Sequence, residues 1–255
     1  MSGSLFDVQG RRAIVTGGDR GLGHGQAEGL LEAGAKVVVM ARTESKIDTA
    51  VAEWAERGME AGGVVADLSD AASRGDAFDE AVRILGGLDI LVNTAGAQSR
   101  HPSEEFPLQD YETVMSVNAT APFDLCQRAA RIFLPQGSGK IINMASMLSF
   151  FGGFTVPAYA ASKGAIAQLT KAFANEWTSK GVNVNAIAPG YMATDMNVNL
   201  MGDDNPRYQE ITARIPAHRW GTADDLKGIT IFLASRASDY LSGAVIPVDG
   251  GYLVR

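Results

Sequence analysis

The chain is poor in the residues that build disulfide scaffolds and metal sites. It has a single cysteine, Cys126, so no intrachain disulfide can form, and the surrounding run FDLCQR is typical of a packed helix rather than a reactive thiol. The three histidines, His24, His101 and His218, lie too far apart to indicate a metal site. We therefore expect neither a disulfide framework nor a resident metal.

Charge and long apolar runs are also scarce. Charged residues make up 20% of the chain and hydrophobic residues 46%, which is typical of a folded globular protein. A net charge of -7 without a basic stripe argues against nucleic acid as a partner. No apolar run approaches the roughly 18 residues that span a bilayer. No basic stretch followed by an apolar one, as in a signal peptide, precedes the first motif. We expect a soluble cytoplasmic protein with a small-molecule substrate and no membrane partner.

What the chain does have is a repeated alternation of short β-branched runs and helix-length segments. This alternation predicts a single α/β domain over 1–255, a Rossmann-like doubly wound parallel sheet of about seven strands with helices on both faces. The segment 190–220 has weak periodicity, so we expect a substrate loop or lid there. The expected strands are 13–16, 36–40, 63–66, 89–93, 140–143, 182–187 and 244–248. The expected helices are 21–33, 43–57, 70–85, 107–134 with a break near Pro122, 158–180 and 223–234.

A glycine-rich turn follows the first expected strand. In TGGDRGLG at 16–23, Gly17, Gly21 and Gly23 permit a tight turn and a close approach of pyrophosphate to the start of the next helix. The spacing T-G-x-x-x-G-x-G differs from G-x-G-x-x-G. Its position between strand and helix indicates a nucleotide site, and the alternative is a tight turn without a ligand.

The end of the second strand bears on which nucleotide binds. An acid that would hold the adenosine ribose of NAD is expected about 20 residues after the turn, but Arg42 stands at this strand end. With Arg20, it could bind a ribose 2′-phosphate, which favours NADP(H) and leaves NAD(H) possible. The alternative is that both arginines are solvated. Asp67 is placed to accept a hydrogen bond from adenine, or else caps the helix that follows.

Tyr159 and Lys163 are four residues apart within a predicted helix. This spacing puts both side chains on one helical face, where an ammonium can favour the phenolate and bring proton exchange towards neutral pH. Taken alone, the spacing favours an exposed tyrosine and a solvated lysine one turn apart. The rest of the chain must therefore decide its role.

The ordered motifs resemble the short-chain dehydrogenase/reductase family over essentially the whole chain. They are Thr16-Gly17, Gly21, Gly23, Asp67, Asn93-Thr94-Ala95-Gly96, Asn118, Ser146, Tyr159-x-x-x-Lys163 and Pro189-Gly190. One position departs, because Thr94 stands where the family usually has a second asparagine. The resemblance implies an NAD(P)-dependent oxidoreductase that interconverts alcohols and carbonyls.

The resemblance also implies a role for each matching residue. Tyr159 is the expected acid-base, and Ser146 is expected to hydrogen-bond the reacting oxygen. Lys163 is expected to lower the tyrosine pKa and bind the nicotinamide ribose, and Asn118 to hold a water of a proton relay. The expected cofactor-binding residues are Gly17, Asp19, Arg20, Gly21, Leu22, Gly23, Arg42, Asp67, Leu68, Asn93, Ala95, Gly96, Tyr159, Lys163, Pro189, Gly190, Met192 and Thr194.

Longer runs within the family bear on the substrate. Runs such as NMASMLSF at 143–150 and RIPAHRWG at 214–221 resemble 2-deoxy-D-gluconate 3-dehydrogenases, also described as 2-dehydro-3-deoxy-D-gluconate 5-dehydrogenases. A sugar acid needs a cation for its carboxylate, and Arg100 offers one. The expected substrate residues are Gln98, Arg100, Ser146, Met147, Tyr159 and Tyr191. The alternatives are an NADPH-dependent 3-oxoacyl-thioester reductase and a non-catalytic nucleotide sensor.

Assembly is expected from the family more than from the residues. Small side chains along the helix that begins near Ala158 would allow close packing of helices, within the domain or across a symmetric interface. The resemblance implies a homotetramer, and a dimer remains an alternative.

Overall fold

A computed structural model describes residues 4–202 and 204–255. In these residues, seven parallel strands form one sheet in the order β3-β2-β1-β4-β5-β6-β7, which confirms the predicted doubly wound class. The strands are β1 Arg12–Thr16, β2 Lys36–Ala41, β3 Ala61–Val65, β4 Ile90–Asn93, β5 Gly139–Met144, β6 Val182–Pro189 and β7 Val245–Val248.

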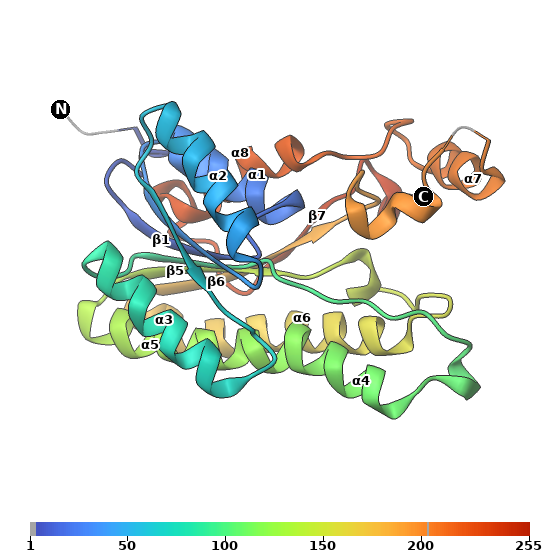
Figure 1. Ribbon diagram of the computed structural model, residues 1–255, viewed down its shortest axis with the longest axis horizontal. Coiled ribbons are helices and arrows are strands. Elements are labelled where there is room, and N and C mark those ends of the chain that lie inside the picture. The colour runs from blue at the N-terminus through green and yellow to red at the C-terminus, as the bar shows by residue number, and fades with distance from the viewer. Residues whose placement is uncertain (1–3, 203) are drawn as a thin grey trace.

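Helices cover both faces of this sheet. Figure 1 shows α1, α2 and α8 over one face and α3, α5 and α6 over the other, with α7 at one end, away from the sheet. The helices are α1 Gly21–Glu32, α2 Glu44–Glu56, α3 Ala71–Leu85, α4 Leu108–Met115, α5 Ala121–Gln136, α6 Pro157–Trp177, α7 Pro206–Arg214 and α8 Lys227–Ala234. None of the helices in the described ranges is long and apolar enough to cross a bilayer.

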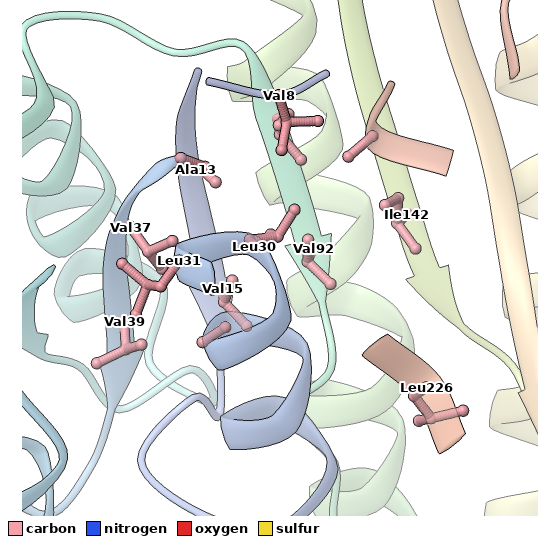
Figure 2. Packing of buried hydrophobic residues seen from close by; sticks show 14 of the residues in the cluster. Val8, Ala13, Val15, Leu30, Leu31, Val37, Val39, Val92, Ile142 and Leu226 are labelled. Carbon is pink, nitrogen blue, oxygen red and sulfur yellow. The ribbon is translucent and has the colours of Figure 1, made fainter. Parts of the chain in front are cut away.

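The strands are apolar on both faces because each face packs against helices. In β2, Val37 and Val39 belong to one buried cluster, and Val38 and Met40 to the other. This is the period-2 alternation of a strand whose two sides are both covered. Figure 2 shows Leu30 and Leu31 of α1 packed beside strand residues on the first face. Two cores therefore fix the sheet between its helix layers.

The strand order reverses direction at β1. The chain proceeds outward from β1 to β2 and β3, then returns to β4 on the other side of β1. In such sheets, ligands bind in the crevice beyond the carboxyl ends of the strands at this switch point. The predicted glycine turn follows β1 and the NTAG motif follows β4, so both lie at this crevice.

Two expectations about elements need correction. The expected helix 107–134 is divided by a π-helical turn at Ser116–Thr120, just before the expected break near Pro122, and the helix then continues as α5. The segment 190–220 is not irregular throughout, because α7 forms within it after Asn205 caps its first turn by accepting from Arg207 N. Both corrections concern elements beside the candidate site.

Candidate active site

The glycine turn after β1 is tightly packed on one side and open on the other. Gly17 has a φ of 65°, and a Cβ at Gly23 would lie 2.1 Å from the carbonyl oxygen of Gly17, so a side chain at Gly23 would prevent this close approach. Gly21 has a φ of 56° and no atoms near its missing Cβ. The turn therefore leaves open space beside backbone at the start of α1.

The first turn of α1 carries no competing anion. Its N-cap residue, Arg20, makes no side-chain capping bond, and the first turn has no acidic residue. Backbone N–H groups at such an end are unsatisfied and favour a pyrophosphate. These features fit a dinucleotide held at 17–23, including Asp19 and Leu22. The guanidinium of Arg20 bonds to Asp195 Oδ2 at 3.3 Å, across the crevice from the turn.

Arg42 and Asp67 lie at neighbouring strand ends. Ala41 pairs with Val65, and Ala66 N donates to Ala41 O at 2.7 Å, so the two residues that follow are close. The charge of Arg42 helps to lower the pKa of Asp67, after the larger effect of hydrogen bonds from Ser69. Asp67 does not cap α3, because Asp70 does so by accepting from Ser73 N. An exposed cation therefore sits beside an exposed carboxylate where an adenosine would lie, with Leu68 buried behind them.

In the NTAG motif at the end of β4, the side chain of Asn93 points into the protein, and the backbone of the residues after it faces the crevice. The amide of Asn93 is buried and donates to Asn143 Oδ1 at 2.9 Å, so this side chain faces the sheet interior rather than the crevice. Thr16 Oγ1 accepts from the backbone N–H groups of Thr94 and Ala95, which ties the motif to the glycine turn. Ala95 is half-buried and Gly96 exposed. Backbone is thus the part of this motif that a cofactor can reach.

The departure at Thr94 has a structural reason. Its hydroxyl donates to Gln26 Oε1 at 2.5 Å, and Gln26 Nε2 donates to Thr230 Oγ1 at 3.1 Å. Gln26 is fully buried in α1, and Thr230 lies in α8. Threonine at this position therefore completes a buried chain between the NTAG motif and two helices.

Ser146, Tyr159 and Lys163 come together beyond the carboxyl end of β5. Ser146 follows β5 and caps a short 3-10 turn, while Tyr159 and Lys163 lie one turn apart near the start of α6. The hydroxyl of Ser146 lies close enough to the phenol of Tyr159 to favour its charged form. The ammonium of Lys163 lies 5.5 Å from the centroid of the Tyr159 ring. The structure thus brings the three predicted groups into one site.

Burial dominates the ionisation of this site. It raises the pKa of Tyr159, and the hydrogen bond from Ser146 opposes that rise. Burial also lowers the pKa of Lys163 to about 8. The Lys163 ammonium donates to Met144 O at 2.6 Å instead of to the phenol. Ser146 favours the phenolate, and the expected lowering of the tyrosine pKa by Lys163 remains a prediction.

Asn118 lies in the π-helical turn, a feature that is frequent at functional sites. Its amide exchanges two hydrogen bonds with the backbone of Ala97, at 2.7 and 2.9 Å, and donates to Ser162 Oγ at 3.1 Å. Ser162 in turn donates to Tyr159 O. The side chain of Asn118 therefore ties the loop after β4 to α6, and the water that it is expected to hold remains a prediction.

Ser149 is a residue of this site that the sequence analysis did not identify. Its hydroxyl donates to Lys163 O at 2.7 Å and accepts from Ser146 N at 3.3 Å. One side chain thus joins the loop that carries Ser146 to the helix that carries Tyr159. A serine three residues after a candidate catalytic serine is the signal, because that spacing allows a capping box.

The loop after β4 supplies one wall on the substrate side. With its amide oriented by hydrogen bonding, Gln98 accepts from Arg100 Nε at 3.0 Å and Nη2 at 2.8 Å. Asp110 accepts from Ser99 and contacts His101, so residues on both sides of Arg100 are held. Gln98 is uncharged, so it orients Arg100 without neutralising its charge.

The opposite wall comes from the end of β6 and the segment after it. Tyr191 packs against Trp220 and Tyr252, with ring centroids 5.2 and 5.4 Å apart, and Met147 belongs to the same buried cluster. The pKa of Tyr191 is raised mainly by burial, and the charge of Arg100 opposes this rise, so Arg100 lies near Tyr191. The predicted cofactor residues Pro189, Gly190, Met192 and Thr194 lie along the same stretch, with Met192 buried and Thr194 half-buried.

Together these residues can move a proton in a largely dry site. A phenol that shares a hydrogen bond with a serine hydroxyl can take a proton from an alcohol or return it to a carbonyl. Cys126 takes no part, because burial raises the pKa of its thiol to about 12. Among the described residues, no group of three His, Cys, Asp or Glu side chains is arranged to hold a metal ion.

Comparison with known proteins supports this chemistry. Residues 11–205 match the family described as short chain dehydrogenase. A 2-dehydro-3-deoxy-D-gluconate 5-dehydrogenase from Dickeya dadantii (strain 3937) is 46% identical over 253 residues, covering 99% of this chain and 99% of the relative.

Solved structures share both sequence and fold with this chain. A protein from Beutenbergia cavernae, proposed to be an NAD(P)-dependent gluconate 5-dehydrogenase and holding NADP at low occupancy, is 44% identical with a TM-score of 0.95, covering 99% of this chain and 100% of its own. A gluconate 5-dehydrogenase from Burkholderia cenocepacia J2315, in complex with NADP and tartrate, is 41% identical with a TM-score of 0.94, covering 98% of each chain.

Proposed function

Because the chain belongs to the short-chain dehydrogenase/reductase family, oxidoreductases that act on CH–OH groups with NAD(P), we propose that it oxidises a secondary alcohol of a sugar acid or reduces the corresponding ketone. The proposed substrate is 2-dehydro-3-deoxy-D-gluconate, with gluconate and 2-deoxy-D-gluconate as related candidates. The observation that carries this proposal is the full-length similarity to a 2-dehydro-3-deoxy-D-gluconate 5-dehydrogenase, combined with the cation Arg100 held by Gln98.

The proposed chemistry uses Tyr159, which is half-buried, and the buried Ser146 and Lys163 beside it. In oxidation, the phenolate of Tyr159 takes the hydroxyl proton of the substrate, and Ser146 hydrogen-bonds the same oxygen as its charge changes. Lys163 holds α6 against β5 through Met144 O, and with a pKa near 8 it can exchange a proton close to neutral pH. When bound, the nicotinamide accepts or supplies the hydride.

Arg100 is the proposed anchor for the substrate carboxylate. Gln98 uses the Nε and Nη2 atoms of Arg100, so donors on the guanidinium remain for a carboxylate. An arginine oriented by a neutral amide keeps its full charge, unlike Arg219, which pairs with Asp225. The relative from Burkholderia cenocepacia was solved with tartrate, which like a sugar acid carries hydroxyl and carboxylate groups.

We also propose NADP(H) as the preferred coenzyme. The support is Arg42, exposed at the end of β2 beside Asp67, together with Arg20 in the glycine turn. A 2′-phosphate at this position would exchange water for charge-assisted bonds to guanidinium groups. The other parts of the proposal are a homotetrameric assembly and a cytoplasmic location, which follow the family and the composition.

A substrate and coenzyme panel tests the proposal. The purified protein is assayed with NADP⁺ and with NAD⁺ against sugar acids, the matching neutral polyols and, in the reverse direction, acetoacetyl thioesters. We expect the highest kcat/KM for 2-dehydro-3-deoxy-D-gluconate with NADP⁺. Preference for a thioester would assign the chain to 3-oxoacyl reduction, and binding of coenzyme without turnover of any substrate would favour a nucleotide sensor.

A further inference from the structure

A second cavity lies at the edge of the sheet opposite the candidate active site. It has a volume of about 290 Å³ and is lined by residues at the amino ends of the central strands, among them Arg11, Lys140 and Arg236. Lys140 is the second residue of β5, whereas Ser146 lies beyond the other end of that strand. The two sites are therefore separated by the length of β5.

The cavity is rich in positive charge. Its lining includes three cations, Arg11, Lys140 and Arg236, and one anion, Asp239. Lys140 pairs with Asp239 at 2.7 Å, so that pair is neutral overall. The side chain of Lys140 is 6% exposed and also donates to Asn183 Oδ1 and Ser238 Oγ, which satisfies its ammonium. Two arginines remain uncompensated within a chain whose net charge is -7.

Neither arginine has a partner in the part of the chain that the structure describes. The charge of Arg11 contributes, after larger effects of Arg12, to lowering the pKa of Asp89. Both carboxylate oxygens of Asp89 already accept hydrogen bonds from Arg12, however. Burial lowers the pKa of Lys140, and the charge of Arg11 adds to this lowering, so these two cations of the cavity repel each other. An anion in the cavity would relieve this repulsion.

We propose that this cavity binds a small oxyanion of the phosphate type. Guanidinium groups present planar pairs of N–H donors that match two oxygens of a phosphate, and two of them line this cavity. The volume suits a compact ligand, because pockets for larger molecules start near about 300 Å³. The site is distinct from the proposed 2′-phosphate site at Arg20 and Arg42, which lies at the carboxyl ends of the strands.

Calorimetric titration of the protein saturated with NADP⁺ tests this site, because the coenzyme then occupies the proposed 2′-phosphate site. Inorganic phosphate and glycerol phosphate are titrated separately, with chloride at matched ionic strength as the blank. Binding of either supports the proposal, and the tighter one tells whether the ligand is a free ion or a monoester. In Arg11→Gln/Arg236→Gln, we expect affinity to fall by at least about tenfold, as loss of charge-assisted bonds implies.

Three further variants keep the result interpretable. Arg131→Gln/Lys171→Gln removes two exposed cations elsewhere and should bind phosphate as the wild type does. Arg11→Lys/Arg236→Lys keeps the charge, removes the planar donors, and should bind with intermediate affinity. Arg42→Ala without coenzyme should retain the cavity's binding. No binding by the NADP⁺-saturated wild type, or equal affinity in Arg11→Gln/Arg236→Gln, would overturn the proposal.

Discussion

The end of β5 and the segment across the crevice, which contains α7, are held in different ways. At the end of β5, Ser146 and Lys163 are buried and are joined by the hydroxyl of Ser149 and the carbonyl of Met144. Across the crevice, the segment that contains α7 makes exposed ion pairs, such as Arg20 with Asp195, whose side chains are 54% and 78% exposed. A buried group left without its partner costs about 1–3 kcal/mol, whereas an exposed pair contributes about 0–1 kcal/mol. The side chains at the end of β5 are thus fixed by buried contacts, whereas the Arg20–Asp195 pair across the crevice is held weakly.

The largest effect should come from Tyr159→Phe, which removes the proton-transferring atom and keeps the ring. We expect kcat to fall by about 10³-fold, within the range for general acid-base groups, while NADP⁺ affinity is unchanged. Steady-state kinetics and a coenzyme titration measure the two quantities. Tyr111→Phe on α4 is the matched control and should behave as the wild type. Comparable kcat in Tyr159→Phe would remove Tyr159 from the mechanism.

Ser146→Ala should reduce kcat by about 10²-fold and also change its pH dependence. The hydrogen bond from Ser146 lowers the pKa of Tyr159, so its loss raises that pKa. Oxidation needs the phenolate, so the rising limb of the pH profile should move to higher pH, by roughly one unit. A shift to lower pH, or an unmoved limb with reduced kcat, would contradict the assignment of Ser146 as the group that favours the phenolate.

Arg42→Gln tests the coenzyme end of the crevice. Removing a charge-assisted bond to the 2′-phosphate should weaken NADP⁺ binding by about 10- to 100-fold and leave NAD⁺ binding nearly unchanged. Fluorescence titration with each coenzyme measures the ratio. Lys46→Gln, an exposed cation at the start of α2, serves as the control. Equal weakening for both coenzymes would mean that Arg42 does not contact the phosphate.

Ser149→Ala should have the smallest effect of these variants. When the hydroxyl of Ser149 is removed, the loop that carries Ser146 loses one hydrogen-bonded link to α6. We expect kcat to fall about three- to tenfold with KM little changed, as loss of a neutral hydrogen bond implies. The rising limb of the pH profile should move to higher pH, as in Ser146→Ala, and Ser149→Thr should restore it. A lower unfolding temperature without any change in kcat or pH profile would make Ser149 a structural residue only.

The class of fold and the place of the catalytic groups could be predicted because they depend on local pattern. Alternating apolar runs fixed the strands to within a few residues, and the four-residue spacing of Tyr159 and Lys163 put both in the first turns of α6. The π-helical turn around Asn118 was not predicted, since helical periodicity looks the same on both sides of it. The short helix α7 was missed because its flanking glycine and prolines suggested a loop.

Side-chain direction was the part that sequence could not supply. Asn93 ends the expected strand at the crevice, yet its amide points into the sheet towards Asn143. Lys163 is on the expected helical face, but its ammonium donates a hydrogen bond to Met144 O. Both outcomes depend on acceptors far away in sequence, which only the folded chain brings close.

The division between the candidate catalytic groups at the end of β5 and the proposed substrate anchor in the loop after β4 is tested most directly by one kinetic comparison. Ser146→Ala and Arg100→Ala are assayed side by side with 2-dehydro-3-deoxy-D-gluconate and NADP⁺ over a full range of substrate concentration. We predict a lower kcat for Ser146→Ala with KM nearly unchanged, and a KM raised by about tenfold or more for Arg100→Ala with kcat nearly unchanged. An unchanged KM in Arg100→Ala, or a loss confined to kcat in both variants, would contradict it.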